Sequence, residues 1–370
     1  MWLHVISDDK FTGFIQSIFE AACPDENIYA LVPRSSELLE KKGFHSVSSA
    51  ETFSALVFSI ENLDGIIFNP LLTKSLPWLQ SIPASIPVIW YTWGMETYKQ
   101  HHKLRSSCLY LPETKKLMAN HFKFTLVREF KRRIENVIKG RFRNLDRVNY
   151  FVCQLEQEYN LIRDIGFLSR ETQWYPGAVA TIEDAAFGIE KDNELGVDIK
   201  VGNSADPTNN HIDAFLWLKK QNIDGRKIIV PLSYGNENYR DYVIKAGEKY
   251  LGSNFVPLID FLPIEEYNGL NNQCGIVIMN HLRQQALGNI MADLWRGSKL
   301  YMNNTVVYQG YKNWGLEVFQ INSDEVNFCN LEKDVIRHNQ SVLLRKLSKA
   351  SVVSSAKKML EDVKKNALCF

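Results

Sequence analysis

The sequence lacks the cysteine spacing of a metal site or a disulfide scaffold. No C-x-x-C pair occurs, and no two cysteines have the short separation that zinc ligands show. Isolated cysteines in a chain of this length are typical of small buried side chains in a reducing compartment. The cysteines are Cys23, Cys108, Cys153, Cys274, Cys329 and Cys369.

Long apolar runs are absent as well. No run reaches the roughly 18 apolar residues that a spanning helix needs, and the tract at residues 86–93 is among the longest. The N-terminus has no basic region and reaches Asp8 and Asp9 before an apolar stretch develops, unlike a signal peptide. We therefore expect a cytoplasmic protein, or one that lies at most on a membrane surface.

A net charge of one sign is also missing. Lys and Arg number 43 and Asp and Glu 42, a formal charge of +1, so the chain as a whole has no electrostatic reason to bind nucleic acid. Residues 115–147 are the exception, because 11 basic and 3 acidic side chains give 11 − 3 = +8 there, interleaved with apolar residues. This pattern indicates either a basic segment for an anionic membrane surface or a helix with a solvated basic face. The side chains selected for membrane docking are Lys123, Arg128, Lys131, Arg132, Arg133, Lys139 and Arg141.

What the sequence does contain is an α/β pattern in a chain of 370 residues, which is long enough for two domains. Short apolar strands, such as Trp2–Ser7 and Lys227–Pro231, alternate with helical stretches in both halves, which is typical of parallel sheets covered on both faces. We predict two Rossmann-like doubly wound domains with a cleft between them. The predicted ranges are an N-terminal domain at 1–190, a C-terminal domain at 191–340, and a C-terminal helix at 341–370 that packs back on the N-terminal domain. A short strand is also expected at Val306–Tyr308, and one long helix at Gln340–Asn366.

Three polar loops follow strands in the second half. Residues 201–211 (VGNSADPTNNH) lie between a strand and a helix, where small and capping residues leave backbone N–H groups free for an anion. This loop is neither a G-x-G-x-x-G motif nor a P-loop. The loops at 231–236 and 280–289 are similarly placed, and in the latter Arg283 is suited to clamping a diphosphate. A capped turn without a ligand explains each loop alone, whereas three together favour a phosphorylated ligand.

Two acidic side chains follow strands in the first half. Asp8 and Glu96 are candidates for a general base that deprotonates an acceptor hydroxyl, although helix capping or an ion pair explains either one equally well. The chain has no D-x-D motif, so the usual ligand pair of metal-dependent sugar transferases is missing, and no histidine cluster suggests a metal. We expect no metal and no cofactor.

The motifs at 201–211, at Ile229-Val230-Pro231 with Tyr234, at 283–288 (RQQALG) and at 93–96 (WGME) occur in an order that resembles one known family. That family is glycosyltransferase family 56, the TDP-4-acetamido-4,6-dideoxygalactose:lipid II transferases of enterobacterial common antigen synthesis. The resemblance runs from about Trp2 to Ile321, and Glu96 stands where the family usually has Asp. It implies a GT-B fold, with an N-terminal domain for the acceptor and a C-terminal domain for a dTDP-sugar. It also implies a polyprenyl-diphosphate-linked acceptor at the inner membrane and no metal requirement.

With this resemblance, the expected protein is a peripheral enzyme at the cytoplasmic face of a bacterial inner membrane that transfers a deoxyamino sugar from dTDP to a lipid-linked saccharide. The expected partners are a nucleotide sugar, the lipid-linked acceptor and an anionic membrane surface. A nucleotide-sugar epimerase of the same architecture and a non-catalytic scaffold of a polysaccharide assembly complex remain alternatives. The residues selected for donor binding are Gly202, Asn203, Ser204, Asp206, Asn209, His211, Tyr234, Phe261, Arg283, Gln284, Gln285, Gly288 and Asn289.

Overall fold

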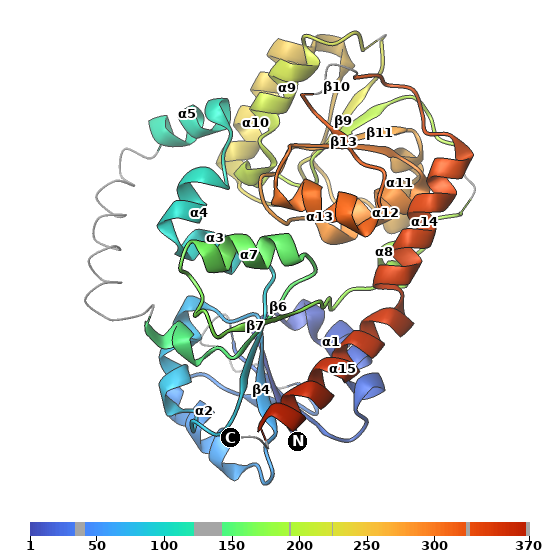
Figure 1. Cartoon of the computed structure of the whole chain (residues 1–370). Helices are drawn as coiled ribbons and strands as arrows, with labels where there is room; N and C mark the ends of the chain where they lie inside the picture. Colours follow the sequence, from blue (N-terminus) through green and yellow to red (C-terminus); the bar gives the residue numbers. More distant parts are fainter. Residues whose placement is uncertain (34–40, 122–142, 192–193, 224, 323–325, 368–370) are drawn as a thin grey trace. The chain divides into compact units, whose positions relative to one another are not determined.

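The computed structural model describes the whole chain except residues 34–40, 122–142, 192–193, 224, 323–325 and 368–370 (Figure 1). The chain divides into two compact units, and the statements below concern their described residues. Unit 1 comprises Met1–His102, Leu126–Thr181 and Lys349–Phe370. Unit 2 comprises Lys103–Thr125 and Ile182–Ser348.

Unit 1 contains a parallel sheet of seven strands in the order β3-β2-β1-β4-β5-β6-β7. Its central strands are fully buried and apolar, as expected for a parallel sheet with helices on both faces. The strands are β1 (Trp2–Ile6), β2 (Asn27–Leu31), β3 (His45–Ser46), β4 (Gly65–Asn69), β5 (Val88–Tyr91), β6 (Tyr150–Val152) and β7 (Gln173–Tyr175).

The helices of unit 1 come from both ends of the chain. α15 packs against α1, so the C-terminal helix belongs to the same unit as the first strand (Figure 1). The helices are α1 (Thr12–Ala22), α2 (Ala50–Ser59), α3 (Met95–Gln100), α7 (Glu156–Asp164) and α15 (Lys349–Ala367). The chain passes from unit 1 to unit 2 within α4 (His102–Ser107).

Unit 2 contains a parallel sheet of six strands in the order β10-β9-β8-β11-β12-β13. In chain order this is 3-2-1-4-5-6, the strand order of a Rossmann domain. The strands are β8 (Ile199–Val201), β9 (Ile228–Pro231), β10 (Phe255–Leu258), β11 (Ile276–Met279), β12 (Lys299–Met302) and β13 (Phe319–Gln320). The helices are α5 (Pro112–His121), α8 (Ile182–Ala185), α9 (His211–Leu218), α10 (Glu237–Leu251), α11 (Ile264–Asn272), α12 (Leu287–Arg296), α13 (Val306–Trp314) and α14 (Lys333–Leu347).

The predicted α/β class with two doubly wound parallel sheets is confirmed, and two predicted elements are wrong. The expected strand at Val306–Tyr308 is the start of α13, because the Thr305 side chain caps the helix by accepting a hydrogen bond from the backbone N–H of Tyr308. The expected single helix at Gln340–Asn366 is two helices, since Ser348 adopts an extended backbone (φ −61°, ψ 153°) between α14 and α15. Among the described residues, no helix is both long and apolar enough to cross a membrane.

We expect two alanine substitutions in helices of unit 2 to have different effects on the free energy of unfolding. A Cβ at Gly247 on α10 would lie 2.3 Å from the Phe255 ring. Gly247→Ala should therefore lower the free energy of unfolding by about 1–3 kcal/mol through overpacking. A Cβ at Gly269 on α11 would meet nothing within 4 Å. Gly269→Ala should accordingly leave stability unchanged or raise it by up to about 1 kcal/mol. Urea unfolding of both variants measures the difference, and equal effects would contradict this packing.

Candidate functional site

The point where the strand order of unit 2 reverses lies between β8 and β11. Chain crossovers leave these two neighbouring strands in opposite directions, which opens a crevice at their carboxyl ends where doubly wound domains bind ligands. The loop at 202–210 follows β8 and the loop at 280–286 follows β11. The structure thus places two of the three predicted phosphate loops on either side of this point.

The first loop is folded around the side chain of Asn209, which is fully buried. Its Nδ2 donates to the carbonyl oxygens of Ser204 (3.0 Å) and Asp206 (3.1 Å), and its Oδ1 accepts from the backbone N–H of Asn203 (3.1 Å). Gly202 has a φ of +69°, and a Cβ there would lie 2.7 Å from Asn209 Oδ1. The turn therefore requires glycine at this position for both backbone and space.

Two buried histidines lie beside Asn209. His281 Nε2 is 2.8 Å from Asn209 Oδ1, and because that oxygen is an acceptor, Nε2 carries the hydrogen. His211 Nδ1 lies 3.3 Å from the hydroxyl of Tyr239, which also accepts from the His211 backbone N–H. Burial lowers the pKa of each histidine to about 3, so both are neutral at pH 7.

Asn210 ties the first loop to the other segments of unit 2. It adopts a left-handed backbone (φ 52°), and its Nδ2 donates to the carbonyl oxygens of Asn280 (3.0 Å) and Leu109 (3.3 Å). Its Oδ1 accepts from the backbone N–H of Leu111 (2.8 Å). The Asn280 side chain returns a bond to the Asn210 carbonyl (3.0 Å). Both loops and the segment that leads into α5 are therefore held by one amide.

The second predicted loop, after β9, joins the first through the backbone. Ala205 donates its N–H to the carbonyl of Tyr234 (2.7 Å) and accepts from the N–H of Asn236 (3.0 Å). Asn203 Nδ2 donates to the Tyr234 hydroxyl (2.9 Å), while Asn203 Oδ1 is buried without a hydrogen-bond partner among the described residues. A buried polar atom of this kind is a place where water or a ligand group supplies the missing bond.

The third loop leads to the start of α12. Arg283 is 3% exposed, and its Nη1 donates to the Gln284 carbonyl (2.7 Å). Ala286 precedes the helix in a left-handed conformation and gives it no side-chain cap. Gly288 and Asn289 lie in the first turn, half-buried. A helix start without a side-chain cap beside a guanidinium is a favourable environment for an anion.

The remaining glutamines of this loop connect it to neighbouring elements. Gln284 Nε2 donates to the Tyr311 hydroxyl on α13 (3.0 Å). Gln285 Oε1 accepts from Thr208 Oγ1 (2.5 Å), and Thr208 in turn donates its backbone N–H to Asp206. Asp206 is thus the N-cap of the short 3-10 turn at Pro207–Asn209.

Exposure separates the predicted donor residues into two groups. Asn209 and His211 are fully buried, and Ser204, Arg283 and Gln284 are 3%, 3% and 7% exposed. Both ends of the Asn209 amide are used within the loop, and its role in donor binding stays a prediction. The helix α9 begins at His211, directly after the loop. Tyr234 and Phe261 are exposed, at 52% and 85%. They follow the neighbouring strands β9 and β10, and their aromatic rings are suited to stacking on a nucleobase.

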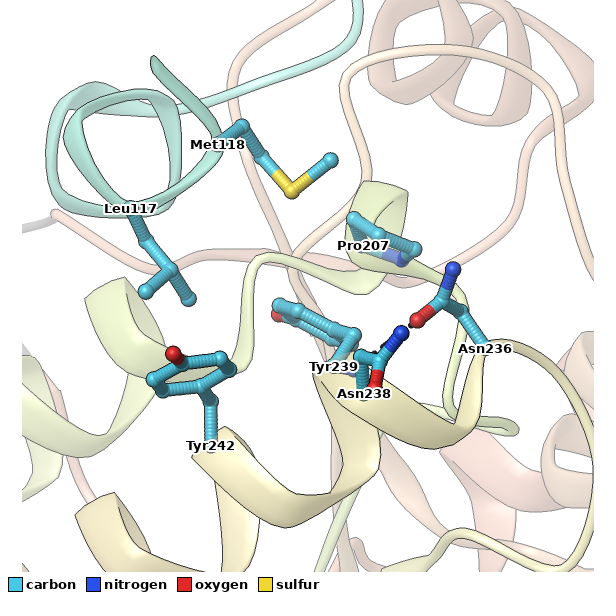
Figure 2. Close-up of a pocket in the computed structure, with 7 residues that line it drawn as sticks. All are labelled: Leu117, Met118, Pro207, Asn236, Asn238, Tyr239 and Tyr242. Atoms are coloured by element: carbon cyan, nitrogen blue, oxygen red, sulfur yellow. Dashed lines mark hydrogen bonds between the residues drawn. The ribbon is translucent and has the colours of Figure 1, made fainter. Parts of the chain in front are cut away.

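A cavity of about 400 Å³ lies on the α5 and α10 side of the first two loops (Figure 2). Tyr239 and Tyr242 of α10 face Leu117 and Met118 of α5 across it, and Pro207 closes one end. The other lining residues are Asn236 and Asn238. No lining side chain carries a charge, so the cavity suits a neutral group next to the loop that Tyr239 supports.

In unit 1, Asp8 and Glu96 follow strands β1 and β5. Asp8 is partly exposed and caps the short 3-10 turn at Asp9–Phe11, accepting from the backbone N–H of Lys10 (3.3 Å). Glu96 is 9% exposed, and its Oε1 accepts from the Thr92 hydroxyl (2.8 Å) and the Trp93 backbone N–H (2.7 Å). Asp8 is therefore the more available of the two carboxylates.

Several residues that organise the site were not predicted from the sequence. Asn210, His281 and Asn280 were not selected, although each lies directly after a strand or a polar turn, the same signal that led to their neighbours. The seven residues chosen for membrane docking lie outside the described residues. Within the described part of the chain, no group of three or more His, Cys, Asp or Glu side chains could hold a metal ion.

We expect the stability of unit 2 to fall in acid through its two buried histidines. The folded pKa of His211 and His281 is about 3, below the 6.5 of the unfolded chain. Their contribution is therefore complete above pH 6.5 and is lost as the pH falls toward 3. Each lowers the free energy of unfolding by about 1.4 kcal/mol per pH unit in this window. His281→Gln should reduce the slope by nearly that amount in urea unfolding between pH 6 and 4, whereas an unchanged slope would contradict a neutral, buried His281.

Comparisons with known proteins agree with the fold of the chain. Residues 168–297 match the model of the family described as 4-alpha-L-fucosyltransferase glycosyl transferase group 56. Among solved structures, Anabaena Alr3699/HepE in complex with UDP-glucose is 13% identical, with a TM-score of 0.61 over 98% of this chain and 99% of that chain. Sucrose-phosphate synthase from Thermosynechococcus elongatus is 9% identical, with a TM-score of 0.62 over 99% and 100%.

A glycosyltransferase from Rickettsia africae is similar at 10% identity, with a TM-score of 0.59 over 99% of this chain and 98% of that chain. At these identities the structures show the fold alone, whereas the family match concerns the sequence itself. Every residue selected for donor binding lies within residues 168–297. The resemblance to glycosyltransferase family 56 is therefore confirmed over that segment, and the chain is a glycosyltransferase of GT-B fold.

Proposed function

We propose that the chain transfers a deoxyamino sugar, similar to 4-acetamido-4,6-dideoxygalactose, from a dTDP donor to a polyprenyl-diphosphate-linked saccharide at the cytoplasmic face of a bacterial inner membrane. The observation that carries the donor site is the start of α12, which has no side-chain cap and follows Arg283 at the reversal point of the unit 2 sheet. The complexes of HepE with UDP and with UDP-glucose show that a protein of this fold binds a nucleoside diphosphate and its sugar.

In this proposal the donor diphosphate lies against Ser204, Arg283 and Gln284, with the first turn of α12 at its negative charge. As the bond between the sugar and the diphosphate breaks, the electron pair leaves with the diphosphate oxygen. Arg283 and the backbone N–H groups of α12 stabilise that charge in a largely dehydrated site, the task that a metal ion performs in other transferases. No metal is required by this arrangement.

Asp8 is the proposed general base. It takes the proton of the acceptor hydroxyl while that oxygen forms its bond to the sugar. Its partial exposure suits this role, whereas Glu96 is engaged at the start of α3 by Thr92 and Trp93. The basic segment 115–147 is proposed to dock the enzyme on anionic lipids, each Lys or Arg near the surface contributing about 1 kcal/mol.

Replacing Arg283 tests the donor site. Arg283→Ala should weaken dTDP binding at least about tenfold, because the guanidinium supplies a charge-assisted contact to the diphosphate. Arg337→Ala removes an exposed arginine of α14 in the same unit and should leave binding unchanged. Titration calorimetry with dTDP and UDP measures the affinity of both variants and also shows which nucleobase the site prefers. Unchanged dTDP affinity in the Arg283 variant would contradict this placement of the diphosphate.

Replacing Asp8 tests the general base. Asp8→Asn keeps the capping oxygen but removes the base, so kcat should fall by about 10²- to 10⁴-fold while the dissociation constant of dTDP stays unchanged. Glu96→Gln, which preserves an oxygen for Thr92 and Trp93, should keep most of the activity. Assays with a lipid-linked saccharide in EDTA distinguish the outcomes, and full activity of the Asp8 variant would exclude it as the base.

A further inference from the structure

A buried group of three charges lies beneath the proposed donor loops in unit 2. Lys200 on β8 and Arg296 on α12 both approach the same carboxylate oxygen of Asp293, at 2.5 Å and 3.3 Å. The three side chains are 1–2% exposed. Asp293 raises the pKa of Lys200 against the effect of burial, so the lysine is protonated, as is the guanidinium of Arg296.

The three charges do not balance, since two cations share one anion. Further hydrogen bonds of the two cations go to neutral side-chain amides of α11. Lys200 Nζ donates to Asn271 Oδ1 (2.8 Å), and Arg296 donates to Asn268 Oδ1 (2.9 Å) and Asn272 Oδ1 (2.8 Å). The group therefore carries a net charge of +1 in the interior. Asp198, the nearby carboxylate before β8, is partly exposed and accepts from the Lys227 backbone, so solvent screens it.

This unbalanced charge sits close below the crevice. Lys200 is two residues before Gly202, about 7 Å along a strand. Asp293 is six residues after the first residue of α12, about 9 Å along the helix. The strand and the helix joined by the three charges are thus the two elements that lead into and out of the candidate phosphate loops. Between them lies a protein interior, where charges are screened far less than in water.

Resting on the proposed function, we propose that Lys200 is a positioning and electrostatic residue for the donor diphosphate, which gives unit 2 a fixed positive potential under its phosphate loops. A purely structural group could have been neutral, with one cation for the one carboxylate. The excess cation has the sign of the helix start above it, so both favour an anion at the crevice. Its effect grows with the charge of the ligand, which a loss of packing would not do.

The test measures the ratio of the dissociation constants of dTMP and dTDP, by titration calorimetry on the full chain. In Lys200→Met the group becomes neutral, so the preference for dTDP over dTMP should fall about threefold, the size expected for one extra charge at roughly 10 Å in a partly screened site. Arg296→Gln makes the group neutral by a second route that leaves Lys200 in place, and should give the same fall if the lysine variant folds poorly.

The double variant Lys200→Met/Asp293→Asn is the decisive control. It loses more native contacts than either single variant but restores the net charge of +1, now on Arg296, and should recover the wild-type ratio. A structural role predicts instead that both nucleotides bind more weakly by the same factor, with the ratio constant in every variant. That result would overturn the inference, and so would a double variant whose ratio of dTMP to dTDP dissociation constants stays as low as that of Lys200→Met. A wild-type protein that binds no nucleoside diphosphate would overturn the proposed function itself.

Discussion

The side-chain amide of Asn210 is the interaction on which the site depends. One buried group holds the loop after β8, the loop after β11 and the segment before α5, because its nitrogen and oxygen bond to backbone atoms of each. A parallel sheet by itself fixes where strands end but leaves their loops free. α9 begins directly after the left-handed turn at Asn210, and the side chain of Asn209 next to it holds the loop through a bond to the Ser204 carbonyl.

The loops at the crevice of unit 2 combine neutral and hydrogen-bond-donating groups with the carboxylate of Asp206, which accepts hydrogen bonds within its own turn. His211 and His281 are neutral, Asp206 is used as a cap, and the start of α12 has no side-chain cap. Burial of the histidines costs stability in acid, yet it keeps their ring nitrogens as hydrogen-bonding groups of fixed protonation. The transfer proposed for this chain needs such an environment, because negative charge would develop on a departing diphosphate.

Much of the fold followed from local pattern. Continuous apolar runs such as β11 and β4 are buried on both faces, so their sequence alone predicts strands of a parallel sheet. Val306–Tyr308 has the same β-branched and aromatic composition and nevertheless forms α13, because the Thr305 cap and the helical spacing of Val307 and Tyr311 outweigh the strand propensity. Composition alone does not distinguish these cases, since capping depends on one side chain.

The α/β class, the loops after β8, β9 and β11 and the family resemblance all follow from the sequence, because strands, turns and motifs are local properties of the chain. How the polar side chains of those loops are used depends on the packing of distant segments. Asn209 and Arg283 look equivalent as polar loop residues. Both ends of the Asn209 amide bond within its own turn, whereas Arg283 donates to the Gln284 carbonyl in the loop that precedes α12. The group formed by Lys200, Asp293 and Arg296 likewise arises only when strand and helix pack together, since Lys200 lies 93 positions before Asp293 in the chain.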